Sequence, residues 1–160
     1  MVGDRVNSRQ RSDIGTDIGS ADGHHRLVVP NSFSELVRVS EWVRSFAHER
    51  RLARQLAYGL ELAVNEELVN IMSYAYCDDA QHTIVVELHA QPDRIRVEVE
   101  DDGVPFNPLE LPIKEPPESL EKSRPTGRGI PLMRSFMDEL HYLRRDSRNV
   151  LTMVLYCAKT

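Results

Sequence analysis

The longest periodic stretch of the chain, residues 51–76, most limits the folds open to it. Its apolar residues recur at helical spacing and share one face: Ala53, Ala57, Leu60, Val64, Leu68, Ile71 and Ala75. A long helix with one apolar face must bury that face against another layer, and we expect a sheet. The opposite face carries small or polar residues, which leave room for a pocket if that side is covered: Gly59, Ala63, Glu66, Asn70 and Ser73.

Strand patterns lie on both sides of this helix. The run "RLVVP" predicts a short strand that stops at Pro30, followed by an amphipathic helix from Phe33 to about His48. Alternating apolar residues predict an antiparallel hairpin in "HTIVVELHA" and "RIRVEVE", and two closing strands in "ELHYLRR" and "NVLTMVLYCA". With a short helix at or just after Gly129, the order predicts an α+β two-layer sandwich. Its sheet is expected to be mixed, mainly antiparallel, and covered on one face by helices.

The chain is expected to form one domain over residues 26–160, since 160 residues suit a single core. Residues 1–25 are rich in Gly, Ser, Asp and Arg without periodicity, so we predict a flexible arm that includes His24 and His25. Six prolines between Gly103 and Gly127 exclude a regular helix or central strand there. A loop of this length is either a functional lid, over residues 104–126, or a disordered surface segment.

The composition is that of a soluble globular protein, with 41% hydrophobic and 28% charged residues. We find no apolar stretch typical of a secretory signal or a membrane span, and therefore expect a cytoplasmic protein without membrane contact. A net charge of −5 argues against direct binding to nucleic acid and favours a protein partner or small ligand. The two cysteines, Cys77 and Cys157, are too few for a disulfide framework or a four-thiolate zinc site, and we expect reduced core thiols.

Three separate segments carry side chains suited to chemistry. Glu66 and Asn70 lie four residues apart on one helix face, where a carboxylate suits a general base and an amide oxygen suits Mg²⁺. Asp101 ends a predicted strand and suits an exocyclic amine, while Gly103 lets the chain turn away. The run "TGRGI" presents backbone amides before a helix, where phosphates bind. Taken singly, each segment is more commonly a solvated polar pair, an Asp-Gly turn or an ordinary glycine loop.

Together and in this order, the segments resemble the ATP-binding signature of the GHKL ATPase superfamily. The runs "NEELVN", "DDGVPF" and "TGRGI" stand for its N box and its first and second glycine boxes, and the resemblance covers residues 26–158. The short length, Ala75 and Tyr76 after the N box, and "LMRSFMDEL" are most similar to the anti-sigma-factor serine/threonine kinases. Sensor histidine kinases and gyrase or mismatch-repair ATPases need attached parts for which we expect no room here.

The resemblance implies a role for each matching residue. Glu66 would be the general base, and Asn70 would bind the Mg²⁺ that bridges the triphosphate. The adenine amine would be held by Asp101, with Gly103 shaping that wall and Thr152 supporting the adenine edge. Gly127 and Gly129 would let the lid approach the phosphates, and Arg128 between them would add positive charge.

The sequence departs from the family pattern at three positions. Tyr74 stands where these kinases often have His, Asn65 stands where a small hydroxyl is common, and Arg128 replaces a residue that is frequently apolar. None of these changes removes an expected catalytic group. They weaken inferences about partner choice and about a direct phosphate contact by Arg128.

The resemblance implies an ATP- and Mg²⁺-dependent serine/threonine protein kinase. It would phosphorylate an anti-sigma-factor antagonist, sequester a sigma factor and act as a homodimer. One alternative is an ATP-binding anti-sigma module without meaningful kinase activity, and another is a stand-alone histidine-kinase-like ATPase domain. Four apolar residues of the first helix fit either the core or a dimer surface: Leu36, Trp42, Val43 and Phe46.

Overall fold

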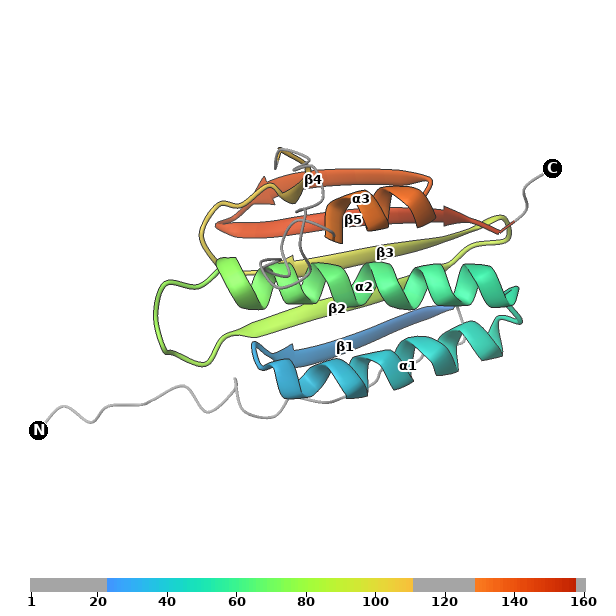
Figure 1. The fold of residues 1–160 in the computed structure, drawn as a ribbon, viewed down its shortest axis with the longest axis horizontal. Helices are drawn as coiled ribbons and strands as arrows, with labels where there is room; N and C mark the ends of the chain where they lie inside the picture. The colour runs from blue at the N-terminus through green and yellow to red at the C-terminus, as the bar shows by residue number, and fades with distance from the viewer. Residues whose placement is uncertain (1–22, 111–128, 158–160) are drawn as a thin grey trace, which may run out of the picture.

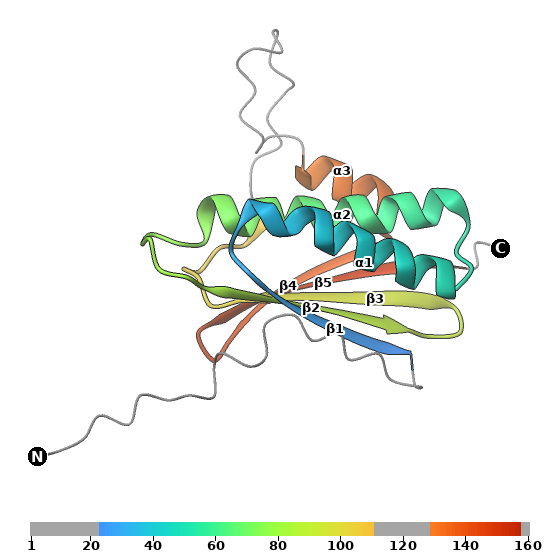
Figure 2. The ribbon, with the colours of Figure 1, turned by 90° about the horizontal axis from the view of Figure 1, so that it is seen from below.

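The computed structural model describes residues 23–110 and 129–157, which form a sheet with helices on one face (Figures 1 and 2). The strands are β1 (His24–Pro30), β2 (Thr83–Ala90), β3 (Arg94–Asp101), β4 (Glu139–Arg145) and β5 (Arg148–Tyr156). The helices are α1 (Leu36–Glu49), α2 (Arg54–Tyr74) and α3 (Gly129–Phe136), with short 3-10 turns at Phe33–Glu35 and Pro108–Glu110. The predicted α+β two-layer sandwich is confirmed. Of the helices in the described residues, none has the length and apolar character to cross a membrane.

The five strands are ordered β1-β2-β3-β5-β4, and every neighbouring pair is antiparallel. No parallel pair occurs among the described strands, so the sheet is less mixed than expected. The reason is that β4 takes the outer edge and β5 returns beside β3 as the second strand of a hairpin. Side chains alternate between the two faces along each strand, so this register decides which residues meet under the helices.

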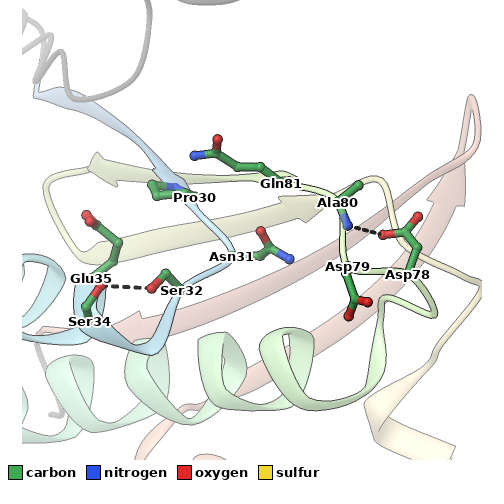
Figure 3. Close-up of a pocket in the computed structure, with 9 residues that line it drawn as sticks. All are labelled: Pro30, Asn31, Ser32, Ser34, Glu35, Asp78, Asp79, Ala80 and Gln81. Atoms are coloured by element: carbon green, nitrogen blue, oxygen red, sulfur yellow. Dashed lines mark hydrogen bonds between the residues drawn. The ribbon is translucent and has the colours of Figure 1, made fainter.

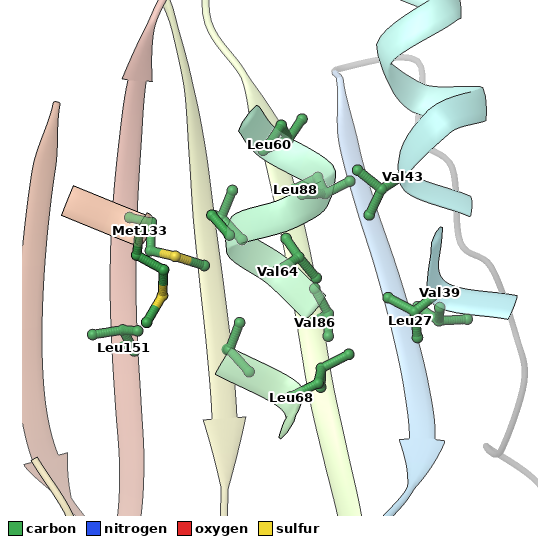
Figure 4. Packing of buried hydrophobic residues seen from close by; sticks show 14 of the residues in the cluster. Leu27, Val39, Val43, Leu60, Val64, Leu68, Val86, Leu88, Met133 and Leu151 are labelled. Carbon is green, nitrogen blue, oxygen red and sulfur yellow. The ribbon is translucent and has the colours of Figure 1, made fainter. Parts of the chain in front are cut away.

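The core lies between the sheet and the helices (Figure 4). The predicted apolar face of α2 is buried from Leu60 to Ala75, whereas Ala53 is exposed just before the helix begins. The α1 residues Trp42, Val43 and Phe46 are buried and belong to the core, which settles their placement. Each fully buried side chain of this size contributes about 1.5–3 kcal/mol relative to exposure.

Two sequence expectations are corrected here. His24 and His25 are not part of an arm but the first residues of β1, and His25 packs edge-on against Phe46 at a ring distance of 5.1 Å. Cys77 is exposed rather than buried, because it follows α2 in the loop before β2; Cys157 is partly buried, and both thiols are free.

A two-residue turn fixes the register of the last hairpin. Asp146 and Ser147 have φ angles of 51° and 62°, the left-handed conformation that tight hairpin turns require at both positions. The turn pairs Arg145 with Arg148 and therefore Arg144 with Asn149. On its other side β5 pairs with β3, and there Asn149 lies opposite Asp101 at the end of β3.

Candidate nucleotide-binding site

The helix α2 carries the first two predicted site residues. Asn70 is buried, with 3% of its surface exposed, and Glu66 one turn earlier is partly buried. Burial raises the pKa of the Glu66 carboxyl above its usual value. Within the described residues, no hydrogen bond or ion pair engages this carboxylate. A partly buried, unengaged carboxylate with a raised pKa is well suited to accept a proton.

Asp101 is the last residue of β3 and lies on the helix-covered face of the sheet, as Val97 and Val99 do. It is buried, and its Oδ1 accepts hydrogen bonds from the Gly103 backbone N–H at 2.8 Å and from Asn149 Nδ2 at 2.9 Å. Burial raises the pKa of the Asp101 carboxyl, and these two hydrogen bonds oppose that rise. Both hydrogen bonds end on one oxygen.

Glu67 is a buried carboxyl that sequence analysis missed. Burial raises its pKa to about 8, and the negative charge of Asp101 raises it further. Asn70 follows three residues later on the same helix. The three side chains therefore form one buried polar group between α2 and β3. Glu67 Oε2 and Asn70 Nδ2 have no hydrogen-bond partner, which is rare for buried polar atoms and marks this place for a ligand. The available signal was a carboxylate on the apolar helix face, seven residues after Leu60.

Asn149 is the second residue of the candidate site that the sequence analysis missed. It is buried opposite Asp101 in the β3–β5 register. Its Nδ2 donates to Asp101 Oδ1 and, at 2.9 Å, to the Val104 carbonyl. Its Oδ1 accepts from the Tyr142 hydroxyl at 2.7 Å and from Arg144 Nη1 at 2.9 Å. Asn149 thus orients the Asp101 carboxylate from the neighbouring strand.

The structure does not bring Thr152 to Asp101. Thr152 pairs with Glu98 on one side and His141 on the other, and its strand neighbours Leu151 and Met153 face the helices. Because side chains alternate along a strand, Thr152 points to the face away from the helices. The position of β5 that supports Asp101 is Asn149, three residues earlier.

Gly103 holds the end of β3 against the end of α2. The Val104 N–H donates to the Ala75 carbonyl at 2.7 Å. A Cβ on Gly103 would overlap the Ala75 backbone oxygen and lie 2.8 Å from Asp101 Oδ1. Glycine is therefore needed here for close backbone approach; a wall against adenine remains a prediction.

The remaining predicted site residues belong to the second glycine box. Gly127 and Arg128 lie outside the described residues, as does the predicted lid after residue 110. Gly129 begins α3, where the sequence predicted a helix. The helix α3 packs on α2 through Phe136, which lies against Gly59. The described part of the site therefore consists of α2, the end of β3 and the start of β5.

A separate open hollow of about 600 Å³ lies between the β1–α1 connection and the loop before β2 (Figure 3). None of the predicted site residues lines it. Its lining includes the carboxylates Glu35, Asp78 and Asp79, which would repel a triphosphate. We therefore place the candidate site at α2 and β3.

Comparison with known proteins agrees with this geometry. The family model described as histidine kinase-like ATPase domain matches residues 29–155. The serine/threonine-protein kinase BtrW of Bordetella bronchiseptica is 31% identical over 117 residues, which are 73% of this chain and 82% of that protein. An anti-sigma F factor of Clostridium perfringens is 30% identical over 59% of this chain and 68% of its own length. The serine-protein kinase RsbW of Bacillus mycoides is 31% identical over 58% of this chain and 59% of its own.

Solved structures show the same fold. The RsbU and RsbW domains of a Mycobacterium tuberculosis protein align with a TM-score of 0.57 and 12% identity, over 84% of this chain. This chain spans 33% of that protein's chain. A blue-light activated histidine kinase of Erythrobacter litoralis aligns with a TM-score of 0.50 and 17% identity, over 81% of this chain and 42% of that one. The family match, the helix-covered sheet and the site residues on α2 and β3 all agree. The chain therefore belongs to the histidine kinase-like ATPase domain family.

Proposed function

We propose that this chain is an ATP-dependent protein serine/threonine kinase that phosphorylates an anti-sigma-factor antagonist and sequesters a sigma factor. The observation that carries the proposal is the partly buried carboxylate of Glu66, one turn before buried Asn70, which no other described residue engages. The similar proteins named above, two protein kinases and an anti-sigma factor, support the reaction and the partners.

The chain's own residues fit ATP and Mg²⁺. Asn70 is buried on α2 and would bind the ion through its amide oxygen, since magnesium takes oxygen ligands and normally only one or two from the protein beside the phosphates. When bound, the ion supplies charge neutralisation for phosphoryl transfer. Asp101, fixed by Asn149, accepts a hydrogen bond from the adenine amine. Gly127 and Gly129 would let the chain approach the phosphates closely, and Arg128 between them would add positive charge there.

Glu66 supplies the chemistry in this proposal. Its carboxylate orients the acceptor serine or threonine hydroxyl and takes the proton as the oxygen attacks the terminal phosphorus of ATP, while the bond from that phosphorus to the bridging oxygen breaks and ADP leaves. A raised pKa makes the carboxylate a better base, provided that it is ionised at the working pH. A module that only bound ATP and a sigma factor would not need a base here. The expected homodimer remains a prediction, to be checked by light scattering.

The test measures phosphotransfer to the purified antagonist and ATP affinity for three variants side by side. Glu66→Gln keeps the size of the side chain but removes its basicity, so transfer should fall by roughly 10²–10⁴-fold while ATP still binds. Asn70→Ala should impair ATP binding and transfer together. Glu61→Gln is the matched control, because Glu61 also lies on α2 but pairs with Arg44 at 3.5 Å. Wild-type transfer by Glu66→Gln would refute Glu66 as the base, whereas the absence of transfer by the wild-type chain would favour the anti-sigma module without kinase activity.

A further inference from the structure

The face of the sheet away from the helices carries an ordered grid of charged side chains that the proposed function does not use. In the β1–β2 register His24 lies opposite His89 and Arg26 opposite Glu87, and in the β2–β3 register Glu87 lies opposite Glu98. Two carboxylates directly opposite each other on neighbouring strands repel and need compensation. The compensation comes from cations and imidazoles on the same face.

Each carboxylate of this pair uses one oxygen for an arginine. Glu87 Oε1 lies 3.3 Å from Arg26 Nε, and Glu98 Oε1 is bound by Arg96. The other oxygen of each points to a histidine. Glu87 Oε2 lies 3.6 Å from His24 Nε2 and 3.4 Å from His89 Nε2, and Glu98 Oε2 lies 3.6 Å from His89 Nε2.

The two imidazole rings are fixed by stacking on each other, but their Nε2 atoms make no hydrogen bond. The rings of His24 and His89 stack with their centroids 4.3 Å apart and their planes 6° from parallel. Both Nε2 atoms are buried and have no hydrogen-bond partner.

Two of the three ligand separations are those found around a metal ion. Because an imidazole nitrogen coordinates in the plane of its ring, one of the two stacked rings must turn about its Cβ–Cγ bond for both Nε2 atoms to face the same ion. The three ligand atoms His24 Nε2, Glu87 Oε2 and His89 Nε2 lie within 4.8 Å of one another. Nitrogen and oxygen ligands about 2.0–2.2 Å from a tetrahedral Zn²⁺ are about 3.3–3.6 Å apart. The two histidine–Glu87 separations, 3.6 and 3.4 Å, fall in this range, although they exceed an ordinary charge-assisted hydrogen bond.

We propose that His24, Glu87 and His89 bind one divalent transition-metal ion, with Zn²⁺ as the best fit. Imidazole with carboxylate suits Zn²⁺ and its neighbours in the first transition row, whereas Mg²⁺ prefers oxygen ligands alone. Water takes the fourth position, and Glu98 is the nearest further carboxylate. The ion would tie the start of β1 to the middle of the sheet. It is distinct from the Mg²⁺ that the proposed kinase uses, and lies on the opposite face of the sheet.

The experiment titrates Zn²⁺ into the chelator-treated full chain by calorimetry, without nucleotide, because ATP itself binds metals. We expect one Zn²⁺ per chain. His89→Ala and, separately, His24→Ala should each weaken binding by at least about tenfold. Since the His24 side chain is 41% exposed, its loss should leave the fold intact even if His89→Ala does not. His141→Ala is the matched control, because His141 lies on the same face beside a carboxylate, with Nε2 3.1 Å from Glu139.

Three results would overturn the proposal. The first is the absence of stoichiometric Zn²⁺ binding, and the second is unchanged binding in both histidine variants. The third is a thiolate-to-metal band in the spectrum of the Co²⁺ form, which would assign the ion to Cys77 or Cys157. Excess Mg²⁺ should not displace the Zn²⁺. None of these measurements involves phosphotransfer, so they test the metal site independently of the proposed kinase activity.

Discussion

Asp101 receives two donors on a single carboxylate oxygen, and this arrangement decides the effect of substitution there. In Asp101→Asn one acceptor oxygen becomes a donor, so the side chain cannot both accept from Gly103 and Asn149 and accept from the adenine amine. The mispaired group costs about 1–3 kcal/mol, which weakens ATP binding by roughly 5–150-fold.

Asp102→Asn is the control for this substitution, because Asp102 is exposed and contacts His82 at 3.3 Å. ATP affinity, measured by calorimetry, should hardly change in this variant. Equal losses in the two variants would mean that Asp101 is the wrong carboxylate.

The buried Glu67 carboxyl predicts a pH-dependent stability. Its folded-state pKa of about 8 lies above the usual 4.5, so the folded chain retains a proton that the unfolded chain releases. The free energy of unfolding should therefore fall as the pH rises from 4.5 towards 8, by up to several kcal/mol. Glu67→Gln is neutral throughout and should lack this component.

Urea unfolding of both proteins between pH 5 and 8 measures the difference. If the difference in free energy of unfolding between Glu67→Gln and wild type stays constant over this range, Glu67 is ionised in the folded protein. Glu66→Gln provides a matched comparison on the neighbouring position, because Glu66 is only partly buried.

At the scale of elements, the junction of α2 with β3 depends on Gly103. Gly103→Ala places a methyl group against the Ala75 backbone, which cannot rotate away, and should destabilise the fold by about 1–3 kcal/mol. Gly59→Ala is the comparison, since its Cβ would meet the Phe136 side chain at 2.7 Å, which can shift, and alanine favours a helix. Thermal unfolding should show the larger loss for Gly103→Ala; the reverse order would contradict this account of the junction.

The elements were largely predictable from sequence, because α2 and the strands have regular apolar periodicity. The site was predictable only in part. Asn70 and Asp101 follow from their motifs, but the choice between Thr152 and Asn149 depends on which face of β5 each residue occupies. The face that each residue of β5 occupies is set by the pairing with β3 and by the left-handed turn at Asp146 and Ser147. Neither can be derived from the local pattern of β5.

Two further residues escaped prediction for related reasons. Glu67 interrupts an apolar helix face, and a single carboxylate there does not indicate which buried groups it will meet. His24 looked like part of a polar arm, because its place in β1 depends on pairing with His89, 65 residues further along the chain. Pairing over such a distance is a property of the fold rather than of the local sequence.

At the scale of the whole molecule, the sheet separates two surfaces. The helix-covered face holds the apolar core and, beneath the C-terminal half of α2, the polar group of Glu67, Asn70 and Asp101. The opposite face carries the charged grid around Glu87. A ligand on the helix side contacts α2 and the sheet together and should therefore stabilise the fold as a unit.

This coupling gives a prediction that does not depend on kinase activity. A ligand that binds only the folded chain raises the free energy of unfolding by about 2.7 kcal/mol at one hundred times its Kd. Mg²⁺-ATP should thus raise the urea midpoint and the Tm of the wild type, and a chelator should remove most of the gain. Asn70→Ala should lose the gain at the same nucleotide concentration, because its magnesium ligand is missing, whereas Glu66→Gln should keep it in full. Stabilisation of Asn70→Ala equal to that of wild type would show that the ion reaches the nucleotide without Asn70, even if ATP binding itself were confirmed.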